Sequence, residues 1–168
     1  MITYGKQSIN NDDVDFVAKV LKSSHLTQGP TIQKFENKLK KKFKSNFAFT
    51  TNNGTSALHL IGRVLNWNKG DIVVVSPITF LSSVNSILYC GATPKFVDIN
   101  LEDYTLDIKK LEDLLIKYKR AGKKVKAVIV TDYAGHPADW INLYRLKKKY
   151  KFKLVNDNCH AVGASINK

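Results

Sequence analysis

The stretch GDIVVVSPITFLSSVNSILYCGATPKFVDI, residues 70–99, decides the fold class. It begins with the apolar run DIVVV (residues 71–75), which predicts a strand buried on both faces. A helical pattern follows near residues 82–89, and PKFVDI (residues 94–99) predicts a second strand. A strand, a helix and a strand in this order form the unit from which parallel α/β sheets are built.

The same alternation continues on both sides of this unit. Asn11 or Asp12 can cap a first amphipathic helix, and a second helix follows the Gly29-Pro30 break. Further strands are expected at residues 47–51, 126–132 and 151–157, and further helices at residues 56–65, 108–120 and 140–150. We therefore expect five strands in a three-layer α/β/α fold with a mostly parallel, doubly wound sheet. Residues 1–44 would form N-terminal helices, and residues 45–168 the α/β core.

The composition is that of an ordinary globular domain, with 168 residues of which 43% are hydrophobic. The N-terminus has no signal-peptide pattern and no apolar run is long enough to span a membrane, so a cytoplasmic protein is expected. The two cysteines, Cys90 and Cys159, fit neither a disulfide framework nor a zinc site. No histidine spacing indicates a metal site.

The chain is strongly basic, with a formal net charge of +13. Lysines cluster at residues 38–44 and 145–150, and such a field would attract nucleic acid or phosphorylated small molecules. Solvated helix faces explain the clusters equally simply, and no RNA-binding aromatic motif, zinc finger or glycine-rich KH loop is present. A non-catalytic basic module that binds nucleic acid or another polyanion remains the alternative function, and nucleic acid is not the expected partner.

Polar residues gather where the predicted strands end, in TNNGTS, SPITF, DYAGHPAD and DNCHAVGA. Ligands of doubly wound sheets bind outside the carboxyl ends of the strands. In TNNGTS, Gly54 would let the backbone turn sharply, and Thr55 and Ser56 would offer hydroxyls and amides to a phosphate at a helix N-terminus. Equally, Thr55 could simply be an N-cap. Neither a dinucleotide-binding nor a P-loop motif is present.

Asp157 would lie at the mouth of the same crevice, where a buried carboxylate needs a cation or several donors. A protonated heterocyclic nitrogen would meet that need, as in pyridoxal phosphate enzymes; a loop cap is the simpler explanation. Phe80 could cover the face of a flat ring or belong to the core. His160 could donate to a ring substituent or be structural.

Taken together, five segments occur in the order found in one family: HLTQGPTIQKFE, TNNGTSALHL, residues 70–99, DYAGHPAD and LVNDNCHAVGA. They cover nearly the whole chain. The sequence resembles the N-terminal part of the large domain of the DegT/DnrJ/EryC1/StrS aminotransferases, fold type I pyridoxal phosphate enzymes that act on nucleotide-linked keto sugars.

The resemblance implies roles for individual residues. Gly54, Thr55 and Ser56 would bind the cofactor phosphate, Phe80 would stack on its ring, Asp157 would pair with its pyridinium nitrogen, and His160 would approach its ring oxygen. Thr27, Gln28 and Gly29 would contact the substrate.

Histidine at position 160 together with DYAG is most similar to the branch of the family that serves pseudaminic acid biosynthesis. That branch aminates C4 of a UDP-linked 4-keto-6-deoxy-N-acetyl sugar with glutamate as the donor. A related dehydratase shares the same scaffold, and the family usually forms homodimers with sites at the interface.

One departure from the family concerns the lysine that forms the Schiff base with the cofactor, which lies a few tens of residues beyond the aspartate. Lys168 is too close to Asp157 to take that role. The second phosphate-binding serine and the small C-terminal domain have no counterpart either. The resemblance therefore implies a fragment without the Schiff-base lysine, which would not transaminate by itself.

Overall fold

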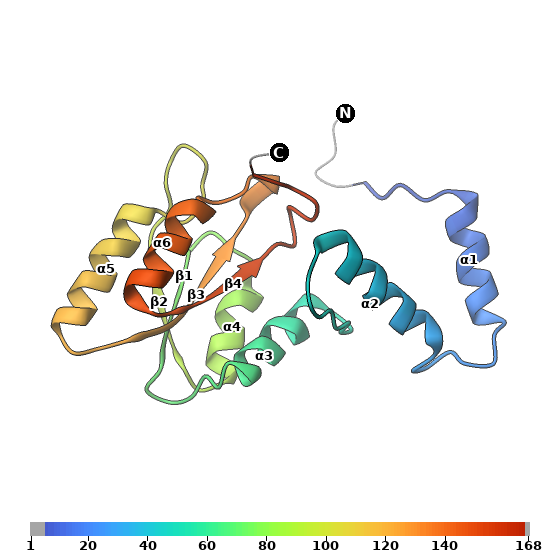
Figure 1. Ribbon diagram of the computed structural model, residues 1–168, viewed down its shortest axis with the longest axis horizontal. Helices are drawn as coiled ribbons and strands as arrows, with labels where there is room; N and C mark the ends of the chain where they lie inside the picture. Colours follow the sequence, from blue (N-terminus) through green and yellow to red (C-terminus); the bar gives the residue numbers. More distant parts are fainter. Residues whose placement is uncertain (1–5, 167–168) are drawn as a thin grey trace. The chain divides into compact units, whose positions relative to one another are not determined.

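The computed structural model describes residues 6–166 of the chain (Figure 1). Two compact units divide between Thr50 and Thr51. The first contains α1 (Asn11–Leu21) and α2 (Pro30–Phe43). The N-cap of α1 is Asn10, one residue before the expected position, because Asn10 and Asp13 form a reciprocal capping box.

The expected strand at residues 47–51 does not form. A strand is stable only when a neighbouring strand satisfies its backbone, and no strand of the described chain pairs with this segment. The backbone N–H and the hydroxyl of Thr50 instead donate to the Glu36 carboxylate, at 2.8 and 3.0 Å. Phe47 and Phe49 remain exposed. The prediction of five strands was therefore wrong, since the described residues form four.

The second unit is an α/β domain. Its elements are α3 (Gly54–Val64), β1 (Ile72–Val75), α4 (Leu81–Tyr89), β2 (Thr93–Phe96), α5 (Ile108–Arg120), β3 (Val125–Thr131), the 3-10 turn η1 (Tyr133–Gly135), α6 (Trp140–Tyr150) and β4 (Lys153–Asp157). The four strands are parallel in the order β2-β1-β3-β4. The second strand ends earlier than expected, at Phe96, because Ile99 bridges to Leu106 in a separate antiparallel contact.

Helices cover both faces of this sheet (Figure 1). Alternate residues of the strands point to opposite faces, as they do for Val73 and Val74 in β1. On one face, α5 and α6 contribute Leu111, Leu115, Leu143 and Leu146. On the other, α3 and α4 pack Leu58 and Ile87 around the fully buried Trp67. The prediction of a three-layer α/β/α fold is confirmed.

The topology creates a crevice between β1 and β3. The chain leaves β1 through α4 on one face of the sheet and returns to β3 through α5 on the opposite face. The loops that follow β1 and β3 therefore diverge, which is where doubly wound proteins bind ligands. None of the helices among residues 6–166 is long and apolar enough to cross a membrane.

Candidate functional site

Asp157 is the last residue of β4 and is only 4% exposed, at the carboxyl edge of the sheet. The Ser83 hydroxyl, from the buried side of α4, donates to Asp157 Oδ2 at 2.5 Å. A buried carboxylate needs such donors. The carboxylate therefore lies where the sequence predicted it, with a partner that the sequence did not reveal.

Further hydroxyls extend this contact across the crevice. Thr79, in the loop after β1, donates to Ser83 Oγ at 3.1 Å, and its hydroxyl lies 2.7 Å from that of Thr131 at the end of β3. The chain of hydroxyls thus joins the carboxyl ends of three strands. The available signal was Ser83 and Ser86, three residues apart on the face of α4 that should be apolar, and both fully buried.

Cys159 joins Asp157 to the start of α3. Its hydrogen bond to Asp157, together with burial and the aspartate's charge, raises the pKa of the Cys159 thiol to about 11. A Cβ atom on Gly54 would lie 3.7 Å from Cys159 Sγ. The structure therefore brings the first turn of α3 close to the Asp157 carboxylate.

The N-terminus of α3 differs in detail from the expectation. The N-cap is Asn53, whose side chain accepts from the Ser56 N–H at 2.8 Å, so the suggestion that Thr55 is an N-cap was wrong. Gly54 has no left-handed backbone conformation, so the predicted sharp turn at this glycine was also wrong. Within the described chain, the N–H groups of Gly54 and Thr55 have no acceptor. Two free amides at the positive end of a helix suit an anion.

The two other cofactor candidates are exposed. Phe80 immediately precedes α4 and is 71% exposed, so the alternative that it belongs to the core was wrong. His160 follows β4, and its ring centroid lies 6.0 Å from that of Tyr133 in the loop after β3. Both residues flank Asp157 in the fold, because Phe80 lies one turn before Ser83 and His160 lies three residues after Asp157.

The DYAGHPAD loop is held by a second buried carboxylate, Asp132. It accepts hydrogen bonds of 2.9 Å from the Ala138 N–H, from Trp140 Nε1 and from the Asn156 side chain. Asn156 precedes Asp157 on β4, so these bonds fasten the loop to the strand that carries the site. Nothing in the sequence pattern distinguished this structural aspartate from Asp157, since each follows a buried strand.

Thr27, Gln28 and Gly29 lie in the first unit, just before α2. Gln28 adopts a left-handed conformation with φ of 52°. A Cβ on Gly29 would approach the His25 carbonyl oxygen to 2.8 Å, so this turn requires glycine. Gln28 and Gly29 line a shallow pocket of about 430 Å³ with Glu36.

The comparison with family models decides the classification. The model of the DegT/DnrJ/EryC1/StrS aminotransferase family matches residues 7–168. The chain belongs to this family. The resemblance noted in the sequence is therefore confirmed.

Relatives of defined activity agree with this assignment. The chain is 37% identical, over 164 residues, to a UDP-4-amino-4,6-dideoxy-N-acetyl-beta-L-altrosamine transaminase of Campylobacter jejuni. The match covers 98% of this chain and 42% of that transaminase. The chain thus spans about two fifths of the length of this relative.

Solved structures of the family have the same fold. Helicobacter pylori PseC, an aminotransferase involved in the biosynthesis of pseudaminic acid, superposes with a TM-score of 0.90 at 29% identity, covering 99% of this chain and 43% of PseC. The sugar aminotransferase Spr1654 of Streptococcus pneumoniae, solved in its pyridoxal phosphate form, gives a TM-score of 0.84 at 28% identity, covering 96% of this chain and 44% of Spr1654.

Proposed function

We propose that this chain supplies the cofactor-binding part of a pyridoxal phosphate-dependent aminotransferase. The reaction is transfer of an amino group from glutamate to C4 of a UDP-linked 4-keto-6-deoxy-N-acetylhexose, in the biosynthesis of pseudaminic acid or a related surface sugar. The names of the Campylobacter jejuni transaminase and of Helicobacter pylori PseC support this substrate class. Whole members of the family would act as homodimers.

The buried Asp157 carboxylate is the observation that carries the proposal. Within residues 6–166 it has no ion pair, and its donors are the neutral hydroxyl of Ser83 and the thiol of Cys159. An ionised carboxylate so deeply buried is costly without a cation. A protonated ring nitrogen above β4 would supply that cation, and Asp157 would in turn keep the nitrogen protonated.

The remaining candidates fit the rest of the cofactor. The Gly54 and Thr55 amides and the Ser56 hydroxyl would bind its phosphate, the exposed Phe80 ring would cover one face, and His160 would donate to its ring oxygen. Bound pyridoxal phosphate supplies the electron sink and carries the amino group. Thr27, Gln28 and Gly29 would contact the sugar nucleotide.

A proton must also move between the substrate carbon and the cofactor, and we assign that step to a lysine that this sequence does not contain. Lys168 is outside the described residues and only eleven positions beyond Asp157 in the sequence. Accordingly, we expect the 168-residue chain by itself to bind cofactor weakly and not to turn over.

Pyridoxamine 5′-phosphate is a suitable probe, because it needs no bond to a lysine. We expect fluorescence titration to give saturable binding that weakens at least about tenfold in Asp157→Asn, since the variant removes one charged hydrogen bond. The matched control is Asp139→Asn, an exposed N-cap where asparagine caps equally well. Equal affinity in the wild type and Asp157→Asn would contradict the assignment of Asp157.

The reaction itself is tested with a chimera in which residues 7–168 replace the matching segment of the Campylobacter jejuni transaminase. We expect the chimera to form 2-oxoglutarate from glutamate when the UDP-linked 4-keto sugar is present. The Asp157→Asn chimera should form little. A chimera that binds pyridoxamine phosphate but does not aminate this sugar would refute the proposed substrate.

A further inference from the structure

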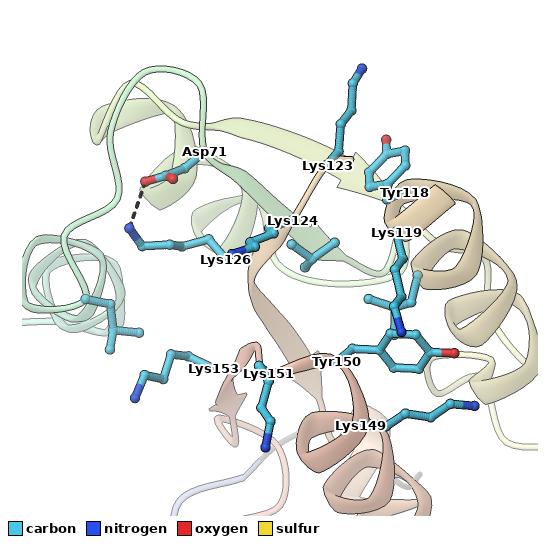
Figure 2. Close-up of a pocket in the computed structure, with 13 residues that line it drawn as sticks. Asp71, Tyr118, Lys119, Lys123, Lys124, Lys126, Lys149, Tyr150, Lys151 and Lys153 are labelled. Atoms are coloured by element: carbon cyan, nitrogen blue, oxygen red, sulfur yellow. Dashed lines mark ion pairs between the residues drawn. The ribbon is translucent and has the colours of Figure 1, made fainter. Parts of the chain in front are cut away.

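A second pocket, of about 620 Å³, lies at the amino edge of the sheet, the edge opposite to Asp157 (Figure 2). Its polar lining comes from the residue before β1, from the segment between α5 and β3, and from the segment between α6 and β4. The labelled side chains are Asp71, Tyr118, Lys119, Lys123, Lys124, Lys126, Lys149, Tyr150, Lys151 and Lys153.

The charge of this pocket is almost entirely of one sign, with seven lysines and a single aspartate in the lining. Asp71 pairs with Lys126 at 3.2 Å, and Lys149 pairs with Glu112 at 2.8 Å. The other five lysines have no ion pair within the described part of the chain. Figure 2 shows the lysine side chains arranged around the pocket, from all three segments.

Helix termini explain only part of this cluster. Lys119 and Lys149 lie in the last turns of α5 and α6, where cations complement the helix dipole. Lys123, Lys124 and Lys153 lie beyond those helices, where no dipole calls for them. Like charges held close together repel one another, so a bound anion would lower the energy of the pocket.

We propose that this pocket binds a small ligand that carries several phosphates, of the class of inorganic tripolyphosphate and nucleoside triphosphates. The volume lies in the range of small-molecule sites, which is roughly 300–1,000 Å³. Lysine is a compact point charge suited to phosphate oxygens. Lysines on three segments match several phosphates better than one. The site is separate from the proposed cofactor site, because the two lie at opposite edges of the sheet.

Isothermal titration of the 168-residue chain with inorganic tripolyphosphate, at physiological ionic strength, tests the proposal. The pocket variant is Lys123→Gln, Lys124→Gln and Lys153→Gln together, all three being exposed residues. The matched control is Lys38→Gln, Lys41→Gln and Lys42→Gln on α2, which removes the same charge from exposed positions elsewhere. We expect the pocket variant to bind about tenfold more weakly and the control to bind within about twofold of the wild type.

Titration with UTP identifies the source of the phosphates. Tighter binding of UTP than of tripolyphosphate, lost in the pocket variant, would support a nucleotide; equal binding would support an inorganic chain. In either case, affinity for pyridoxamine phosphate should be unchanged in the pocket variant, so failure here leaves the proposed function intact.

Three results would overturn the proposal. Wild-type chain that binds no tripolyphosphate at millimolar concentration would do so whatever the variants show. Equal losses in the pocket variant and the α2 control would assign binding to net charge alone. Tighter binding of a short single-stranded DNA than of tripolyphosphate, with a steep dependence on salt, would identify a nucleic-acid surface.

Discussion

The Ser83 hydroxyl donates a hydrogen bond of 2.5 Å to Asp157 across 74 positions of sequence, joining α4 to the end of β4. Both residues are buried, and Ser83 in turn accepts from Thr79. The bond fixes one oxygen of the carboxylate. We infer that it orients the other oxygen, so Ser83 acts on the proposed cofactor site as a positioning residue.

Replacing Ser83 with alanine should therefore affect both stability and binding. The variant removes a donor from a buried carboxylate, a change that costs about 1–3 kcal/mol. We expect a lower midpoint in urea unfolding and weaker binding of pyridoxamine phosphate.

Ser86→Ala is the matched control, because Ser86 is equally buried on α4 but donates to the Ser83 carbonyl rather than to Asp157. It should leave the affinity for pyridoxamine phosphate unchanged. If both variants weaken binding equally, the effect comes from the packing of α4 and not from the hydroxyl.

The sequence was sufficient to predict the layers of the α/β unit and the position of Asp157. Buried parallel strands are continuous apolar runs, such as IVVV in β1, and each run that formed a strand ends close to a polar loop. Local sequence therefore locates strand ends, and the topology rule places those ends at one edge.

The segment at residues 47–51 and the Ser83 contact show where this reasoning stops. Phe47 and Phe49 alternate with small residues as strand residues do, but a strand also requires a pairing partner, which local sequence does not contain. Likewise, the Ser83 bond depends on how α4 packs beside β4, a tertiary relationship. The N-cap of α3 was missed for a simpler reason, since Asn53 and Thr55 are both good caps.

Asp132 is expected to determine the stability of the loop after β3. Asp132→Ala would leave three donors without their acceptor, including Trp140 Nε1, so we expect a loss of about 3 kcal/mol in the free energy of unfolding. Asp139→Asn, which keeps the α6 cap, should change it by less than about 0.5 kcal/mol. Equal unfolding midpoints in urea for the two variants would show that the three bonds contribute little.

Gly62 should tolerate no side chain, because α3 packs tightly against the loop that follows it. A Cβ at this position would lie 2.6 Å from Trp67 Cε3 and 2.8 Å from Cys90 Sγ. We expect Gly62→Ala to destabilise the fold by about 1–3 kcal/mol through overpacking. Val64→Ala, at an exposed position of α3, should stay within about 0.5 kcal/mol of the wild type, as measured by thermal or urea unfolding.

Cys159 should react slowly with iodoacetamide although it is exposed. The hydrogen bond to Asp157 is the main cause that raises the pKa of the thiol from 9.0 to about 11. The thiolate is the reactive form, so its fraction at pH 8 is about a hundredfold below that of an ordinary thiol. The alkylation rate should rise with pH up to about 11 and then level off.

Asp157→Asn tests the cause of this slow reaction. The variant removes the negative charge that opposes ionisation, so the pKa of Cys159 should fall and alkylation at pH 8 should become faster. A Cys90→Ala background leaves a single thiol to follow by mass spectrometry. Asp139→Asn in the same background should react like its parent. If Cys159 reacts at the ordinary rate while Asp157 is intact, the hydrogen bond does not hold the thiol in its neutral form.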